Sequence, residues 1–187
     1  MTFNNVIFSG AISFDSRGAN HAKLRLRHDY GYTGKNVGDF EVIDPQGRVM
    51  MVSGANRGIG AALARQFHSD GWVVSLGARN VDQLEASIQG WADHNVSCHS
   101  YDALDPVSGD IWVQATADLR GRVDGLTNNA GIGHMEGLAD LSEEILDEMW
   151  AVNVKGPLRL IQEARPLLAS SGEGRIINVV SLSGKRV

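Results

Sequence analysis

The fold of this chain is decided by the stretch Ser53-Gly54-Ala55-Asn56-Arg57-Gly58-Ile59-Gly60. The apolar run 49–52 comes before it, and an amphipathic run that carries Ile59, Leu63 and Phe67 follows. A strand, a glycine-rich turn and a helix in this order form the phosphate-binding turn of a doubly wound sheet. The stretch therefore predicts a nucleotide site at the end of a buried strand.

The three glycines of this stretch have separate roles. Gly54 has no Cβ and can take the tight turn after the strand. Gly58 lets the backbone approach a pyrophosphate, and Gly60 lets the helix pack closely on the strand. The helix that opens near Ile59 directs unpaired N–H groups toward the phosphate. The spacing is G-x3-G-x-G rather than G-x-G-x-x-G, and an ordinary strand-to-helix turn also contains glycines.

Composition narrows the function classes. The chain has 187 residues, of which 43% are hydrophobic and 21% charged, as in a soluble globular domain. The net charge of −5 argues against a nucleic-acid partner, and no apolar run reaches the ~18 residues of a membrane span. Cys98 is the sole cysteine, which favours a reducing, cytoplasmic location. The six histidines are scattered, so no metal is expected.

The first 46 residues differ from the rest of the chain. They are rich in Gly, Asn and Arg and show no sustained period of 2 or 3.6. This composition predicts a poorly ordered N-terminal extension over residues 1–46. A mis-set translation start would also account for it. Residues 47–187 form the nucleotide-binding domain.

Strand and helix signals alternate from Arg48 onward. Apolar runs predict strands at 49–53, 72–76, 96–101, 123–127 and 175–181. Helices are predicted at 59–69, after a cap at Asn80 or Asp82, from Asp105-Pro106, and from Asp140 or Ser142. Five short strands separated by helices predict an α/β fold with a parallel, doubly wound sheet.

Apolar stripes predict which helix faces turn inward. The second helix carries its stripe on Leu84, Ile88 and Trp91. In the third and fourth helices, the predicted stripes are Val107, Ile111, Ala115 and Leu119, and Ile145, Met149, Val152 and Ile161.

The predicted domain is incomplete at its C-terminal end. A single domain of this type usually runs to ~250 residues, and this chain supplies about 140 of them. The sequence then stops shortly after the run 175–181, which leaves that strand as an open apolar edge. Native proteins avoid such edges, so C-terminal strands are expected to be missing.

Five motifs together resemble the N-terminal part of a short-chain dehydrogenase/reductase. The resemblance covers residues 47–187 and implies a Rossmann-like sheet of strand order 3-2-1-4-5. The motifs occur in the family's order: the glycine turn 53–60, Asp102, Asn128-Asn129-Ala130-Gly131, Val152-Asn153-Val154-Lys155-Gly156, and Ser181-Leu182-Ser183-Gly184.

Several motif residues follow strand ends, where ligands of such sheets bind. The resemblance implies that Asp102 accepts a hydrogen bond from the adenine amino group. Asn129 is expected to bond backbone across its turn, while Gly131 lets the cofactor ribose come close. A plain turn is the alternative interpretation for both positions. The cofactor-binding residues implied are Gly54, Asn56, Arg57, Gly58, Ile59, Gly60, Arg79, Asp102, Asn129, Ala130 and Gly131.

Charge at the end of the second strand predicts the cofactor. An enzyme for the non-phosphorylated cofactor places an acid there to hold the ribose 2′-hydroxyl. Alignment with the family puts Ala78 at that position, and Arg79 follows. Arg57 faces the same place from the glycine turn. Two guanidiniums without a carboxylate suit a 2′-phosphate, so NADP(H) is predicted over NAD(H).

Two residues are expected to be catalytic by resemblance. Pro157 has no N–H to give to the Asn153 carbonyl, which predicts a helix kink and a carbonyl free to hold a water. The family is thought to use this asparagine in a proton relay. Ser181 matches the catalytic serine, three residues before Gly184, and would hydrogen-bond a carbonyl or alcohol substrate. Ser183 is the competitor, but its spacing to Gly184 does not match.

The family's general acid is absent from this sequence. It is a tyrosine with a lysine four residues later, and none of Tyr30, Tyr32 and Tyr101 has that lysine. The expectation is NADP-dependent hydride transfer between nicotinamide and a small carbonyl or alcohol, with this chain an inactive fragment. The alternatives are a non-catalytic NADP(H)-binding module and a truncated reading frame. A homo-oligomer is implied for complete family members.

Overall fold

The computed structural model describes residues 43–91, 93–134, 137 and 139–180. Residues 1–42, most of the predicted extension, and Ser181 lie outside this part of the chain. The elements are β1 (Val49–Ser53), α1 (Gly58–Ser69), β2 (Val73–Ala78), α2 (Val81–Ser87), η2 (Asp93–Asn95), β3 (Val96–Ser100), α3 (Ser108–Arg120), β4 (Gly125–Asn128), α4 (Glu143–Trp150), η3 (Ala151–Lys155), α5 (Gly156–Ser170) and β5 (Arg175–Asn178).

The five strands form one parallel sheet in the order β3-β2-β1-β4-β5, which confirms the predicted topology. The register pairs Val52 of β1 with Leu76 of β2 on one side and with Thr127 of β4 on the other. The chain winds outward from β1 to β3, returns to β4 and continues to β5. The order therefore reverses between β1 and β4, where ligands of such sheets bind.

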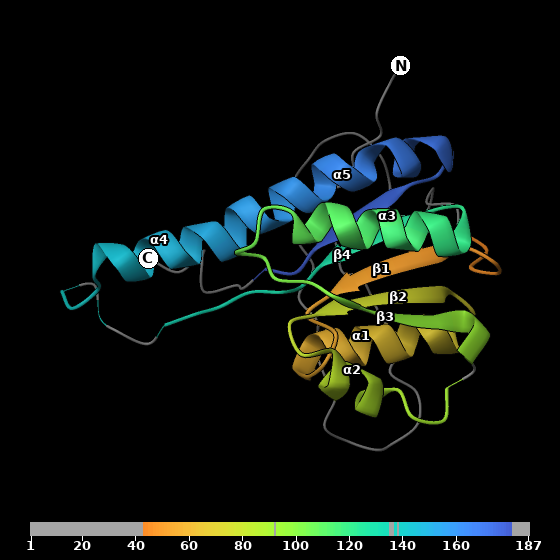
Figure 1. Cartoon of the computed structure of the whole chain (residues 1–187), viewed down its shortest axis with the longest axis horizontal. Coiled ribbons are helices and arrows are strands. Elements are labelled where there is room, and N and C mark those ends of the chain that lie inside the picture. Colours follow the sequence, from red (N-terminus) through yellow and green to blue (C-terminus); the bar gives the residue numbers. More distant parts are fainter. Residues whose placement is uncertain (1–42, 92, 135–136, 138, 181–187) are drawn as a thin grey trace, which may run out of the picture.

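Helices cover both faces of the sheet, as Figure 1 shows: α1 and α2 lie on one side, and α3 and α5 lie on the other. The two faces hold two separate apolar clusters. Met50 and Val52 of β1 point into the cluster beneath α1 and α2, and Met51 points into the other. Every residue of β1 is buried because both of its faces are covered.

The third helix begins later than the sequence predicted. Asp105-Pro106 was expected to start it, but α3 begins at Ser108. The Asp105 carboxylate accepts a hydrogen bond from the Val107 N–H at 3.0 Å, which makes a turn ahead of the helix rather than a cap. Ser108 then bonds both the N–H and the carbonyl of Asp102 through its hydroxyl.

The predicted inward face of the third helix was also wrong. Val107, Ile111 and Leu119 are 55%, 61% and 57% exposed. The buried face instead carries Trp112, whose indole lies against Gly77 of β2, where a Cβ would come within 2.7 Å of the ring. Its Nε1 donates to the Ser75 hydroxyl at 2.9 Å. The glycine of β2 thus makes room for the largest side chain of this helix layer.

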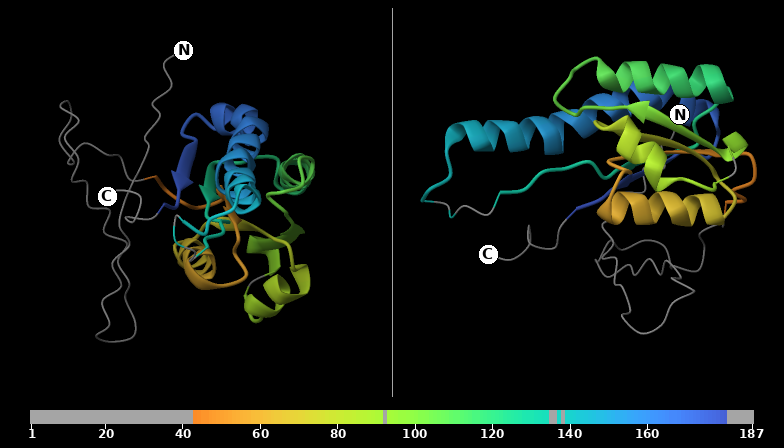
Figure 2. Two further views of the ribbon diagram at one scale, coloured as in Figure 1. Left: turned by 90° about the vertical axis from the view of Figure 1, so that its left-hand side faces the viewer. Right: turned by 60° about the horizontal axis from the view of Figure 1, so that its bottom comes forward.

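The long helix predicted from Asp140 or Ser142 is built of three segments. Ser142 caps α4 by accepting from the Ile145 N–H at 3.3 Å. A single π-helical stretch, η3, joins α4 to α5, and there the Gly156 N–H donates to the Ala151 carbonyl five residues back. Figure 1 and the right view of Figure 2 show α4 extending beyond the sheet. No residue of α4 is buried, whereas α5 buries Leu160, Ala164 and Leu168.

Within the described ranges, no helix is both long and apolar enough to span a membrane.

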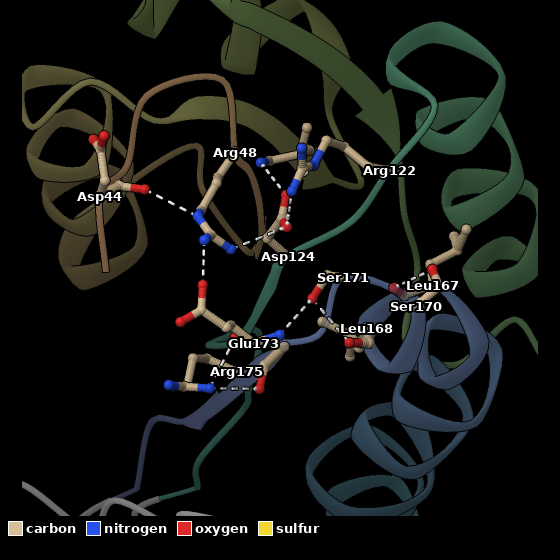
Figure 3. A network of polar contacts seen from close by, with 12 residues as sticks. Asp44, Arg48, Arg122, Asp124, Leu167, Leu168, Ser170, Ser171, Glu173 and Arg175 are labelled. Carbon is tan, nitrogen blue, oxygen red and sulfur yellow. Dashed lines mark hydrogen bonds and ion pairs between the residues drawn. The ribbon is translucent and has the colours of Figure 1, made fainter. Parts of the chain in front are cut away.

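A charged network ties the strands together at their amino ends (Figure 3). Asp124, just ahead of β4, has a side chain only 1% exposed. Its carboxylate accepts from the Val49 N–H at 2.9 Å and from Arg122 Nε and Nη2 at 2.8 and 2.6 Å. Arg48 lies 3.6 Å from the same carboxylate and also pairs with Glu173, in the turn before β5. One buried carboxylate therefore links β1, β4 and the entry to β5.

Replacing Asp124 with Asn should lower the free energy of unfolding by about 2–3 kcal/mol, because the charge that two arginines share is removed in a buried place. Urea denaturation followed by circular dichroism measures this. The matched control is D118N, an exposed carboxylate on α3 that contacts Gln114. Equal midpoints for the two variants would contradict the prediction.

Candidate nucleotide-binding site

The glycine turn joins β1 to α1 at the carboxyl edge of the sheet. The N–H groups of Gly54 and Ala55 both donate to the Gly77 carbonyl of β2, at 2.7 and 3.3 Å. Gly54 has a φ of 65°, and a Cβ there would come within 2.9 Å of the Ala130 Cα. Both constraints require glycine, as the sequence predicted.

The start of α1 is open to solvent on its phosphate-binding side. Arg57 precedes the helix without a side-chain cap, and the first turn carries no acid. A Cβ at Gly58, whose φ is 57°, would meet nothing within 4 Å, and Ile59 is 42% exposed. At Gly60, by contrast, a Cβ would overlap the Gly54 carbonyl. The uncapped N–H groups thus face free space, which fits a dinucleotide pyrophosphate.

The loop after β4 is held against this turn by Ser53 and Asn129. The Ser53 hydroxyl accepts from the N–H groups of Asn129 and Ala130, at 2.9 and 3.0 Å, and lies 3.3 Å from the Thr127 carbonyl. Asn129 Nδ2 donates to the carbonyls of Ser53 and Gly54, at 3.0 and 3.1 Å. Asn129 therefore bonds backbone across the turn as expected.

Asn153 clamps the continuation of the same loop. Its Oδ1 accepts from the Ile132 N–H and its Nδ2 donates to the Ile132 carbonyl, both at 2.9 Å. A Cβ on Gly131 would lie 3.2 Å from Asn153 Oδ1, so a side chain there would press on the clamp. Asn153 itself lies in the π-helical η3, a form common at functional sites. The side chain of Asn153 thus holds the loop after β4 in place.

Asp102 lies just past β3. The Tyr101 N–H donates to the Ala78 carbonyl at 3.1 Å, so Asp102 and Arg79 both follow residues joined across β3 and β2. Asp102 Oδ1 accepts from the Leu104 N–H at 3.0 Å. The second carboxylate oxygen makes no hydrogen bond within the described part of the chain, so Asp102 closes a turn and keeps one oxygen that can accept a further hydrogen bond.

Arg57 and Arg79 are both exposed, and neither guanidinium makes a hydrogen bond or ion pair with a described residue. Ala78, at the position that would carry the acid, is 3% exposed. Next to Arg79, Asn80 caps α2 by accepting from the Gln83 N–H at 2.8 Å. This part of the site therefore carries two free cations, which suits an anionic group.

Tyr101 is not suited to act as the missing acid. It is 4% exposed and packs on Trp112, with ring centroids 5.2 Å apart. Burial, with a smaller contribution from Asp102, raises the pKa of its phenol to about 12. Burial and the charge of Glu85 likewise raise the pKa of the Cys98 thiol to about 11. Among the described residues, no group of three His, Cys, Asp or Glu side chains could hold a metal.

Sequence reasoning missed three residues of this site. Ser53 was quoted only as part of the glycine stretch, although its hydroxyl carries the contact to the loop after β4. Ile132 and Gln83 act through bonds to Asn153 and Asn56, 21 and 27 positions away. The position of Ser53 at the end of the strand before the glycine turn was a signal that could have found it. Nothing in the local sequence indicates the roles of Ile132 and Gln83. Ser181 lies outside the described residues.

Comparison with known proteins identifies the family. A sequence profile described as short chain dehydrogenase matches residues 48–187. Agropine synthesis reductase of Rhizobium rhizogenes is 39% identical over 143 residues, which are 76% of this chain and 33% of that protein. An uncharacterized oxidoreductase of Staphylococcus haemolyticus is 31% identical over 141 residues, 75% of this chain and 61% of that protein.

Solved structures agree with this result. A metagenomic short-chain oxidoreductase in complex with NADP superposes with a TM-score of 0.70 at 34% identity, over 78% of this chain and 67% of its own. An alcohol dehydrogenase of the archaeon Thermococcus sibiricus, complexed with 5-hydroxy-NADP, gives 0.70 at 33% identity, over 75% and 60%.

The chain belongs to the short-chain dehydrogenase family, an oxidoreductase family with a Rossmann-like sheet. It spans about a third of the agropine synthesis reductase and about three fifths of the Staphylococcus oxidoreductase.

Replacing Ser53 with Ala should lower the free energy of unfolding by about 1–3 kcal/mol, because two backbone N–H groups lose their acceptor. Urea denaturation measures the change. The control is S87A, which removes a hydroxyl that bonds only the Leu84 carbonyl of its own helix. If S53A were no less stable than S87A, the hydroxyl would not hold the loop.

Proposed function

We propose that this chain binds NADP(H) in preference to NAD(H), as part of an oxidoreductase that acts on a small carbonyl or alcohol. The observation that carries this proposal is that Arg57 and Arg79, which pair with no described residue, lie near an alanine at the position where an acid would hold a ribose hydroxyl. The two solved neighbours with NADP and 5-hydroxy-NADP support it.

The residues at the carboxyl edge of the sheet have separate parts in holding the nucleotide in this proposal. The N-terminus of α1 takes the pyrophosphate, with Gly58 leaving the space in front of it open. Asp102 accepts from the adenine, and Arg57 and Arg79 grip the 2′-phosphate. The loop 129–132, fixed by Ser53 and Asn153, borders the ribose. The bound nicotinamide supplies the hydride chemistry. By family resemblance, Ser181 hydrogen-bonds the substrate oxygen.

A non-catalytic NADP(H)-binding module is the second candidate. The observation that favours it is that the glycine turn, the start of α1 and the loop after β4, which are all that nucleotide binding needs, are built by bonds within these residues. The two candidates differ in turnover and agree in binding, so the binding experiment below tests what they share.

We also propose that the protein self-associates through its long helix. Leu146, Trp150, Val154 and Leu158 recur every four residues along α4, η3 and α5, and each is 40–54% exposed. Such a stripe on a helix needs a partner. In complete family members the long helix commonly pairs between subunits, so a second copy is the proposed partner.

Replacing Arg57 or Arg79 with Ala should weaken NADPH binding about 10- to 100-fold, because each guanidinium–phosphate contact is lost, and should change NADH binding about twofold or less. Titration of NADPH and NADH fluorescence measures both affinities. The matched control is R65A, an exposed arginine on α1 beyond its first turn. Wild-type affinity for NADH equal to that for NADPH would refute the cofactor preference.

A further inference from the structure

Gln83, in the first turn of α2, makes two bonds that converge on the pair of arginines. Its side-chain Oε1 accepts from Asn56 Nδ2 at 2.8 Å. Its backbone N–H donates to Asn80 Oδ1, also at 2.8 Å. Asn56 directly precedes Arg57, and Asn80 directly follows Arg79. One exposed glutamine is therefore bonded to the chain neighbour of each arginine.

The bond from Gln83 to Asn56 joins the glycine turn to the first turn of α2. Among the described residues, it is the only hydrogen bond between the glycine turn 54–58 and α2. The turn is tied to β2 through the Gly77 carbonyl, but Arg79 and α2 lie beyond that point. Gln83 thus adds a side-chain tether between the turn that carries Arg57 and the start of α2, just after Arg79.

The separation of the two backbones matters because Arg57 and Arg79 carry like charges on long side chains. Without an anion between them the guanidiniums repel each other, and gripping one phosphate together costs both side chains rotamer freedom. Fixing the two attachment points in advance lowers that cost. The amide is also neutral, and its Nε2 makes no hydrogen bond with a described residue, so it can donate to an anion lying between the arginines.

We infer that Gln83 is a specificity-determining positioning residue: by tethering Asn56 it holds Arg57 and Arg79 on two sides of a single phosphate and so favours the 2′-phosphorylated dinucleotide. This inference rests on the proposed NADP(H) function and extends it to a residue outside the family motifs quoted above.

The test is fluorescence titration of the 187-residue chain with NADPH and, separately, with NADH. Q83M keeps the length of the side chain and removes the tether, and N56A removes the other partner. Each should weaken NADPH binding about 3- to 10-fold, the usual effect of one hydrogen bond, and Q83M should leave NADH binding within about twofold. The double variant should lose no more NADPH affinity than Q83M alone, because Q83M has already removed the bond to Asn56.

A third variant distinguishes the effect of the charge at position 83 from the effect of the bond to Asn56. Q83E keeps an acceptor for Asn56 and places a negative charge between the arginines. It should lower NADPH affinity further than Q83M does, with NADH binding unchanged. The matched control is Q114A, an exposed glutamine on α3 that bonds Asp118 and should leave both affinities at wild-type values. Thermal unfolding of each variant records any general loss of structure.

The outcomes distinguish the inference from the function beneath it. If the wild type prefers NADPH and Q83M weakens NADPH and NADH binding equally, or weakens neither, the positioning role of Gln83 is overturned while the proposed function stands. If the wild type binds neither nucleotide or prefers NADH, the proposed function fails and the inference fails with it. A selective, non-additive loss of NADPH affinity supports both.

Discussion

The contact between the Ser53 hydroxyl and the backbone after β4 is the constraint on which the site depends. The connections that follow β1 and β4 lead to opposite faces of the sheet. The segments after these two neighbouring strands therefore diverge and leave a gap between them. Ser53 and Asn129 bridge that gap, because the backbone N–H and the side-chain Nδ2 of Asn129 both donate to Ser53. These bonds fix the positions of the glycine turn, the start of α1 and the loop that Asn153 holds relative to one another. A rigid edge at the switch point is what allows backbone groups to serve as a ligand surface.

The sequence was sufficient for the order and type of the elements, because strand and helix periods are local properties. It was not sufficient for the buried face of α3. Two stripes satisfy the helical period there, one through Ile111 and Leu119 and one through Trp112 and Thr116. The choice between them depends on Gly77 of β2, which lies 35 positions before Trp112 and leaves the space that the indole fills. Apolar character alone would select the first stripe, and complementarity with the sheet selects the second.

In the candidate site, too, some residues could be predicted from the local sequence and others depend on tertiary contacts. Gly54, Gly60 and Asn129 could be predicted, because backbone sterics and turn chemistry dictate these residue types from the local motif. Asn153 was expected to act through its carbonyl, and what the structure shows is a side-chain clamp on Ile132, a bond that depends on the packing of η3 beside the loop. The bond between Asn56 and Gln83 is likewise a product of tertiary structure. The role of Ser181 remains an expectation from the family, since this residue lies outside the described part of the chain.

Because α4 extends beyond the sheet, it is expected to be the least stable helix of this layer toward local unfolding. Its eight residues are too few for an isolated helix to persist in water, and none of them is buried. Its order therefore depends on continuity with α5, whose inner face is anchored in the core. Amide protons should accordingly exchange fastest at the Ser142 end and become more protected toward α5. The bond between Asn153 and Ile132 lies in η3, between the exposed α4 and the anchored α5, so the loop after β4 is expected to stay in place when α4 frays.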